Sequence, residues 1–316
     1  MPEARARRGG LNRGACAGFF GGNECLSGND ERKLLATSRV ISTIFKNRNP
    51  RIGLALSAGG AKGVAFIPFL AALEDMGVRP SVVIGSSAGA LFGGLYAAGV
   101  SPSKMIETME SLGRLPQLQA YDPQLRGGSL LKGQKAHEFI RRILPVHTFD
   151  ETRIPFRAVA VDFWRREEVV IKEGNLADAI RASISIPGIF SPFVMNDRVL
   201  IDGGIMNALP YDRIQNECDF VIALHLSEDD QPEHPTDLPQ FSQMVVGTLR
   251  IMRERIVAVK QEYNPPDYYR RIGIAKVGML DFGRWRETVA AARDEVVDFA
   301  ADLPEALRKA GIRLSS

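Results

Sequence analysis

The stretch "VVIGSSAGALFGG" (residues 82–94) places two adjacent serines between a β-branched run and a run rich in alanine and leucine. The β-branched run predicts a buried strand, the Gly/Ser cluster predicts a tight turn, and the last part predicts a helix. "GSSAG" (residues 85–89) also matches the pattern G-x-S-x-G, with Ser87 at its centre. The stretch therefore predicts a nucleophile elbow, a turn that exposes a serine hydroxyl above the end of a sheet.

The residues on both sides of Ser87 fit this interpretation for a steric reason. Strand and helix backbones crowd together at a sharp elbow, so small residues such as Gly85 and Gly89 are needed there. The turn also puts Ser87 at a helix N-terminus, where free N–H groups and the helix dipole favour developing negative charge. Ser86 is expected to be a turn or capping residue.

Residues 80–103 contain no charged side chain and are long enough to cross a bilayer. Their pattern nevertheless changes from β-branched residues to turn residues and then to helix formers. A strand, a turn and a helix explain this pattern better than a membrane-spanning helix does.

A second strand and helix precede this stretch. "RIGLAL" (51–56) predicts a strand, and "VAFIPFLAALEDMG" (64–77) predicts a helix with Gly77 as its C-cap. Two strand–helix units in succession predict a parallel sheet with crossover helices. Further strands are predicted at 154–163, 167–174, 198–204 and 218–227. A short helix is predicted within 175–187 and another before Cys218 in "YDRIQNECDF" (211–220), and amphipathic helices are predicted at about 239–262 and 283–300.

The loop "SAGGAKG" (57–63) between the first strand and helix has two interpretations. A dinucleotide-binding loop would need G-x-G-x-x-G, but Ala58 stands in place of the first glycine, and the next strand does not end in an acidic residue. The favoured interpretation is an oxyanion hole, because consecutive glycines let backbone N–H groups approach a tetrahedral intermediate closely, with Lys62 adding positive charge. The residues predicted to form it are Gly59, Gly60, Ala61, Lys62 and Gly63.

The proton acceptor for Ser87 is not an obvious histidine. His225 in an apolar strand or His234 in an acidic, proline-rich loop would complete a Ser–His–Asp triad, but neither has a spacing that recommends it. "LIDGG" (200–204) instead puts Asp202 at the carboxyl end of an apolar strand, where ligands bind in open parallel sheets. An aspartate in D-G-G is, on its own, also typical of a turn. As a base it needs a shielded site, because its ordinary pKa is about 3.9.

Composition is typical of a soluble globular protein, and a net charge of +3 gives no support to nucleic-acid binding. Residues 1–50 carry nine Lys/Arg against four Asp/Glu and lack helical periodicity, which predicts a flexible, solvated basic arm, with contact to anionic lipid headgroups as the alternative. Residues 51–316 are predicted to form one α/β domain. Cys16, Cys25 and Cys218 show no metal or disulfide spacing, and with no recognisable secretory signal the expected location is cytoplasmic.

Four segments occur in the order seen in patatin-like phospholipases: "LALSAGGAKGVA", "VVIGSSAGAL", "AIRASISIPGIFSPF" and "LIDGGIMNALP". The chain resembles this family from about Arg51 to Ser227, and the resemblance resumes weakly at 279–289. It implies an α/β, patatin-like three-layer sandwich: a mostly parallel sheet with helices on both faces. It also implies a core at 51–227 and a C-terminal helical part at 236–316.

Carried onto this sequence, the resemblance implies a dyad without histidine. Ser87 would be the nucleophile, and Asp202 of the D-G-G motif, followed by Gly203 and Gly204, would be the base toward the serine and then toward the deacylating water. The implied substrate is a lipid or other acyl ester, so phospholipase, lysophospholipase, galactolipase and simple esterase activities all fit. No cofactor or metal is expected, and any membrane contact would be peripheral.

The loop and the helix after it depart from the family pattern. Ala58 replaces a glycine that the family usually has, which costs about 1 kcal/mol if that position needs a positive φ. Phe66 and Pro68 stand where histidine and glycine are common, which implies a reshaped acyl pocket. These two residues leave the dyad untouched, and Ala58 is the one hint of the alternative, a catalytically weak or inactive lipid-binding or regulatory homologue.

Overall fold

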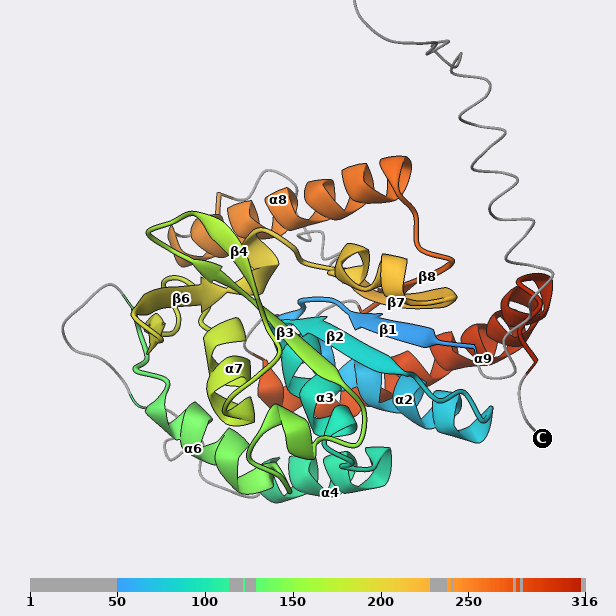
Figure 1. The fold of residues 1–316 in the computed structure, drawn as a ribbon. Helices are drawn as coiled ribbons and strands as arrows, with labels where there is room; N and C mark the ends of the chain where they lie inside the picture. The colour runs from blue at the N-terminus through green and yellow to red at the C-terminus, as the bar shows by residue number, and fades with distance from the viewer. Residues whose placement is uncertain are drawn as a thin grey trace, which may run out of the picture. The chain divides into compact units, whose positions relative to one another are not determined.

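The computed structural model describes residues 50–113, 122, 129–227, 238–239, 241–274, 277–278 and 281–313. Residues 1–49 of the expected basic arm, with two of the cysteines, lie outside the described residues, and so does the acidic loop that carries His234. Contacts between residues group Arg48–Ser316 into one unit, in which a sheet is covered by helices (Figure 1).

Within the described residues, eight strands form one sheet in the order β5-β6-β3-β2-β1-β7-β8, and β4 pairs with β3 outside this path. The pairs β3–β2, β2–β1, β1–β7 and β7–β8 are parallel, whereas β4 and β6 run antiparallel to β3, and β5 antiparallel to β6. The strands are β1 (Ile52–Leu56), β2 (Val82–Ser86), β3 (Phe156–Asp162), β4 (Glu167–Ile171), β5 (Phe193–Met195), β6 (Arg198–Asp202), β7 (Phe220–Ser227) and β8 (Tyr268–Gly273).

Helices cover both faces of this sheet. Figure 1 shows α8 on one side of it and the other labelled helices on the opposite side. The α-helices are α2 (Phe66–Asp75), α3 (Ala88–Ala97), α4 (Pro102–Gly113), α6 (Gln134–Ile143), α7 (Leu176–Ser183), α8 (Phe241–Tyr263) and α9 (Trp285–Lys309). The short 3-10 helices are η1 (Gly60–Ala65), η2 (Phe149–Glu151), η3 (Gly203–Ile205), η4 (Tyr211–Arg213), η5 (Gln215–Glu217) and η6 (Phe282–Arg284).

The two faces bury separate hydrophobic clusters because side chains alternate along each strand. Leu54 of β1 belongs to the larger cluster, with residues of α2, α3, α7 and α9. The next residue, Ala55, belongs to the smaller one, with Leu209 and with Val257 of α8. The predicted α/β architecture, a mostly parallel sheet between two helical layers, is confirmed, although the layer on the α8 side is thinner.

Three elements differ from the predictions. The expected C-terminal helical part also contributes β8, an edge strand whose arginines and exposed positions hide the strand pattern. The segment before Cys218, predicted as a helix, forms the two 3-10 turns η4 and η5. Helix α9 continues to Lys309, past the expected end near residue 300.

The uncharged stretch 80–103 forms a strand and a short helix, as predicted. Its residues build β2 and then α3, both buried inside the domain. Within the described ranges, none of the helices combines the length and the apolar character needed to span a bilayer.

Candidate active site

Ser87 and Asp202 lie 115 residues apart in sequence and are joined by a hydrogen bond. The Oγ of Ser87 donates to Oδ2 of Asp202 at 2.6 Å, and both side chains are buried. The structure therefore brings together the two residues that the sequence singled out as nucleophile and base.

The register of the sheet explains this meeting. Ser86, at the end of β2, pairs with Val159 of β3, whereas Asp202, at the end of β6, pairs with the next residue, Ala160. Strand β4 occupies the other edge of β3 along the same residues. Strands β2 and β6 therefore lie end to end along one edge of β3, with their carboxyl ends facing each other.

The turn at Ser87 is tight. Ser87 has φ 53° and ψ −117°, a backbone conformation that costs a residue with a side chain about 1–3 kcal/mol. A Cβ added at Gly85 would lie 2.2 Å from the backbone of Gly89, and one added at Gly89 would lie 2.1 Å from the carbonyl oxygen of Leu56. Only glycine fits at these two positions.

A third serine, which the sequence analysis did not identify, holds the elbow. Ser183 Oγ accepts a hydrogen bond from the Ser87 N–H at 2.9 Å and donates one to the carbonyl oxygen of Val159 at 2.6 Å. Ser183 thus joins the end of α7 to both β3 and the elbow. It lies in the segment "AIRASISIP", but nothing in the local pattern distinguishes it from Ser185.

Arg181, also missed, supports the segment beside Asp202. This buried guanidinium donates to Ser185 Oγ at 2.7 Å and to the carbonyl oxygens of Gly133 and Ser191. Burial lowers the pKa of Arg181 to about 10. The carbonyl oxygen of Ser185 in turn accepts the N–H of Asp202 at 3.0 Å. Arg181 therefore fixes the loop against which the Asp202 backbone rests.

Asp202 is a carboxyl group with a strongly changed acidity. Burial raises its pKa to about 6, against the lowering effects of the Ser87 hydrogen bond, the positive charge of Arg253 and the N–H of Gly204. That N–H donates to Oδ1 at 2.7 Å. A carboxylate with a pKa near 6 is a better proton acceptor than an ordinary aspartate, which meets the need for shielding stated above.

Arg253 comes from α8 and was not predicted. Its positive charge acts on Asp202, and its Cδ lies 3.4 Å from the position that a Cβ on Gly204 would take. Helix α8 thus places a guanidinium group beside the turn that follows Asp202. The charge pattern of the helix sequence did not reveal this, because the contact depends on how α8 packs.

The glycine loop packs against the segments that follow both dyad residues. A Cβ added at Gly63 would lie 2.6 Å from the Cβ of Ala88, and the Cβ of Ala58 lies 2.8 Å from the position that a Cβ on Gly204 would take. The 3-10 helix η1 begins with a bond from the N–H of Lys62 to the carbonyl oxygen of Gly59. The donors that precede this bond, those of Gly60 and Ala61, are not used by the helix.

Ala58 does not have the positive φ that would make alanine unfavourable at this position. Among the described non-glycine residues, positive φ occurs at Ser87, Arg166, Asn196 and Asp197, whereas in the loop it is Gly60 that has φ 57°. The N–H of Ala58 donates to the carbonyl oxygen of Ala208 at 2.8 Å. Alanine is therefore accommodated at this position without backbone cost.

His225 and His137, two of the described histidines, have other partners. His225 contacts Tyr269 Oη through Nδ1 at 2.7 Å and Glu254 through Nε2 at 3.3 Å. His137 contacts Asp178 at 2.8 Å. The hydroxyl of Ser87 is directed to Asp202, which favours the dyad over a triad based on His225.

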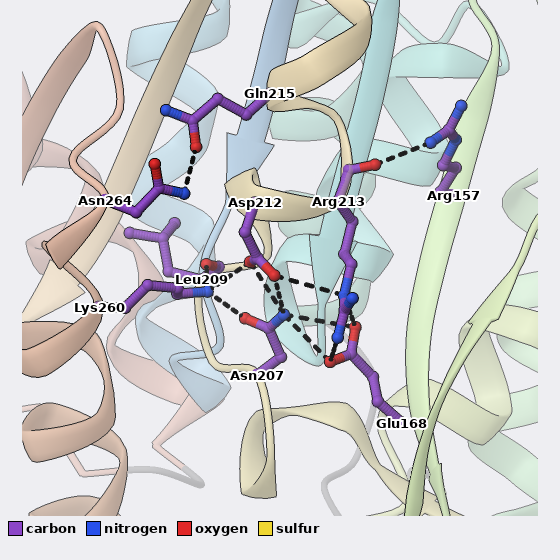
Figure 2. Close-up of polar contacts among 9 residues, drawn as sticks. All are labelled: Arg157, Glu168, Asn207, Leu209, Asp212, Arg213, Gln215, Lys260 and Asn264. Atoms are coloured by element: carbon purple, nitrogen blue, oxygen red, sulfur yellow. Dashed lines mark hydrogen bonds and ion pairs between the residues drawn. The ribbon is translucent and has the colours of Figure 1, made fainter. Parts of the chain in front are cut away.

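A polar network anchors the chain just after Asp202 to helix α8 (Figure 2). Lys260 Nζ donates to Asn207 Oδ1 at 2.5 Å, to the Leu209 carbonyl oxygen at 2.6 Å and to Asp212 Oδ1 at 2.6 Å. The backbone of Asn207 also bonds to the carbonyl oxygen of Gly203. One partly buried ammonium group therefore ties α8 to the segment that leaves the site.

The same network reaches the hairpin of β3 and β4. Asn207 Nδ2 donates to Glu168 Oε2 at 3.2 Å, and Arg213 makes two hydrogen bonds of 2.8 Å to the Glu168 carboxylate (Figure 2). Charged and amide groups from β4, η4 and α8 are thus connected. Asn207 and Lys260 could not be predicted from the local sequence pattern, because these two residues are 53 positions apart in the chain.

Ser87→Gly should be more stable than Ser87→Ala by about 1–2 kcal/mol, because both lose the hydroxyl but only glycine relieves the positive φ. Urea unfolding of the two variants measures the difference. The same pair at Ser103, an exposed residue of α4, should show the opposite order by about 1 kcal/mol. The same order at both positions would contradict a strained elbow.

Lys260→Met should lower the free energy of unfolding by about 3 kcal/mol, because it leaves the Asp212 carboxylate and the Asn207 amide without their shared donor. The matched control is Lys104→Met, which removes a well-exposed lysine from an ion pair with Glu107. That change should cost less than about 1 kcal/mol. Equal losses for the two variants would show that the network adds nothing to stability.

The chain matches known proteins over the part that contains this site. The patatin-like phospholipase family model matches residues 54–213, about half of the chain. An uncharacterized NTE family protein of Mycobacterium bovis is 36% identical over 180 residues, which cover 57% of this chain and 50% of that protein. The chain thus spans about half the length of such a relative.

Two further relatives and one solved structure extend the comparison. Lysophospholipase nte1 of Neurospora crassa is 28% identical, covering 75% of this chain and 17% of that protein. Patatin-like phospholipase domain-containing protein 6 of Mus musculus is 29% identical, covering 62% and 15%. VipD from Legionella pneumophila aligns with a TM-score of 0.46 at 13% identity, covering 80% of this chain and 67% of that one. By the match of the family model, the chain belongs to the patatin-like phospholipase family.

Proposed function

We propose that this protein is a lipid acyl hydrolase that cleaves carboxyl esters through an acyl-Ser87 intermediate. The proposal is carried by one observation, the 2.6 Å hydrogen bond from the hydroxyl of a conformationally strained serine to a buried carboxylate with a raised pKa. A serine and a base within hydrogen-bond reach are what covalent acyl transfer requires.

In the proposed reaction, Ser87 Oγ attacks the ester carbonyl carbon while its proton passes to Asp202. The negative charge that develops on the carbonyl oxygen is stabilised by N–H groups of the glycine loop, from Gly59, Gly60 and their neighbours, and by the N-terminus of α3. Collapse of the tetrahedral intermediate breaks the bond to the leaving alcohol, which takes the proton from Asp202. Water, deprotonated by Asp202, then releases the fatty acid and restores Ser87.

The substrate class is proposed from the family. The family description and the name of the Neurospora crassa relative both refer to phospholipid cleavage. Because this chain spans only part of each relative, headgroup and acyl-chain preference belong to the proposal as well. Phospholipid and lysophospholipid esters are the first substrates to test.

The alternative of an inactive lipid-binding homologue loses its main support. It rested on Ala58 in the glycine loop, and the loop accepts alanine there with the positive φ falling on Gly60 instead. The geometry of Ser87 and Asp202 is compatible with turnover.

The direct test compares purified wild type with Ser87→Ala and Asp202→Asn on phosphatidylcholine, lysophosphatidylcholine and p-nitrophenyl butyrate. Both variants should lose at least about 1,000-fold in kcat/KM, because each removes an essential part of the covalent route. A fluorophosphonate probe should label wild type but not Ser87→Ala, and mass spectrometry of the intact proteins detects the label.

Two matched variants act as controls. Ser86→Ala removes the neighbouring hydroxyl, and His225→Gln removes the histidine that the alternative triad would use; both should keep activity within about three-fold. Full activity of Asp202→Asn would refute the dyad, and loss of activity in His225→Gln with an intact fold would favour the triad.

The acidity of Asp202 gives a pH dependence to activity and to stability. The carboxylate must be ionised to act as base, so kcat/KM should fall as pH drops through about 6. In the folded protein the pKa of Asp202 lies above that of an ordinary aspartate, so the ionised form costs stability above pH 6 and not below pH 4. At pH 8, Asp202→Asn should therefore have a higher free energy of unfolding than wild type, by up to roughly 3 kcal/mol, as measured by urea unfolding. No difference is expected at pH 4, and a pH-independent difference would contradict this account.

A further inference from the structure

Two aromatic side chains project into solvent from the turn between β3 and β4. Trp164 is 74% exposed and Phe163 is 47% exposed, although both are large and apolar. Their rings contact each other edge to face, with centroids 4.9 Å apart and planes at 82°. Arg165 and Arg166 follow directly in the sequence. We call residues Phe163–Arg166 the hairpin tip.

The hairpin tip is built by specific hydrogen bonds, so the exposure of its rings is not a consequence of a loose loop. The buried Asp162 accepts the N–H groups of Trp164 and Arg165 on Oδ1, at 3.2 and 3.0 Å, and the N–H of Arg166 on its carbonyl oxygen at 2.8 Å. Arg166 takes φ 58° to close the turn. A fixed turn that holds two rings away from the core displays an apolar surface.

The hairpin tip lies at the same end of the sheet as the candidate site. Asp202 pairs with Ala160 of β3, and the tip begins three residues further along that strand. At about 3.3 Å per residue, this places the tip about 10 Å beyond Asp202 along the strand. Figure 1 shows the β3–β4 hairpin extending on the side of the sheet where β6 lies.

The charges around the tip fit a surface of lipid headgroups. Arg165 is well exposed and lies 3.7 Å from Asp162 and 3.9 Å from Glu167, while Arg198 also pairs with Glu167. Arginine side chains therefore accompany the aromatic pair in the hairpin, and nearby carboxylates partly balance their charge. Indole and phenyl rings next to arginine are typical of segments that enter the boundary between headgroups and acyl chains.

We propose that the hairpin tip docks the protein on the surface of a lipid bilayer. The rings of Phe163 and Trp164 enter the headgroup–acyl boundary, and Arg165 and Arg166 contact lipid phosphates. Docking at this end of the sheet brings the dyad to lipids that are still in the bilayer; this role rests on the proposed lipid hydrolase function. The tip itself needs no catalytic turnover to bind.

The binding test uses the full-length chain as Ser87→Ala, so that vesicles are not consumed. The sequence has two tryptophans, and the other one, Trp285, is buried at 6% exposure. Phosphatidylcholine vesicles with 20% phosphatidylglycerol should shift the emission of Trp164 to the blue. Vesicles containing brominated phosphatidylcholine should quench it. Both signals should disappear in the double variant Ser87→Ala/Trp164→Phe, in which the remaining tryptophan fluorescence comes from the buried Trp285.

The kinetic test compares Trp164→Ser with a matched control, Phe282→Ser, which removes an exposed aromatic residue near the start of α9. Trp164→Ser should bind vesicles at least ten-fold more weakly and raise the apparent KM for vesicle phospholipid by a similar factor. Its kcat/KM on soluble p-nitrophenyl butyrate should equal that of wild type. Phe282→Ser should behave as wild type in every assay.

The outcomes separate the docking surface from the proposed function. Absence of quenching by brominated lipid, or equal vesicle affinity for both serine variants, overturns the docking surface. The docking surface is also overturned if Trp164→Ser changes only the oligomeric state of the protein, because the rings would then form a contact between protein chains. Quenching by brominated lipid in a protein that hydrolyses neither vesicle nor soluble ester supports the docking surface and refutes the proposed hydrolase. Hydrolysis of these esters without quenching by brominated lipid supports the proposed hydrolase and refutes the docking surface.

Discussion

The end-to-end meeting of β2 and β6 along one edge of β3 is the constraint on which the candidate site depends. Because Ser86 and Asp202 pair with adjacent residues of β3, the two turns that follow them share a small volume. This crowding explains the glycines at both turns: a Cβ on Gly203 would lie 2.1 Å from the carbonyl oxygen of Val159, as close as the contacts at the elbow. The same crowding takes Asp202 out of water and raises its pKa.

The site costs stability that other contacts offset. Ser87 is held in an unfavourable backbone conformation, and an ionised Asp202 is held away from solvent. Ser183 and Arg181 fix the elbow and the Asp202 backbone through hydrogen bonds to several segments, and Lys260 attaches α8 to the chain beyond. The geometry that suits acyl transfer is therefore maintained by residues that do not belong to the dyad, an arrangement expected where a strained site must persist in a stable fold.

The parts of the structure that could be predicted from sequence are those with a local physical signature. A β-branched run followed by small residues identifies the elbow, and an apolar strand ending in D-G-G identifies Asp202. Strand β8 could not be found in this way, because an edge strand with one buried face tolerates charged residues such as Arg270 and Arg271. Ser183, Arg253 and Lys260 were missed for a related reason: their partners are set by how α7 and α8 pack, and packing leaves no pattern in a short window of sequence.

The separation of the dyad along the chain has a consequence for synthesis. Ser87 emerges from the ribosome 115 residues before Asp202, and α8, with Arg253 and Lys260, follows later still. Until β6 has been made, the edge of β3 beyond Val159 has no strand to pair with, and the serine has no carboxylate to take its proton. A nascent chain therefore carries an ordinary alcohol at this position. Under the proposed mechanism, the order of the segments leaves an unfinished polypeptide without its catalytic base.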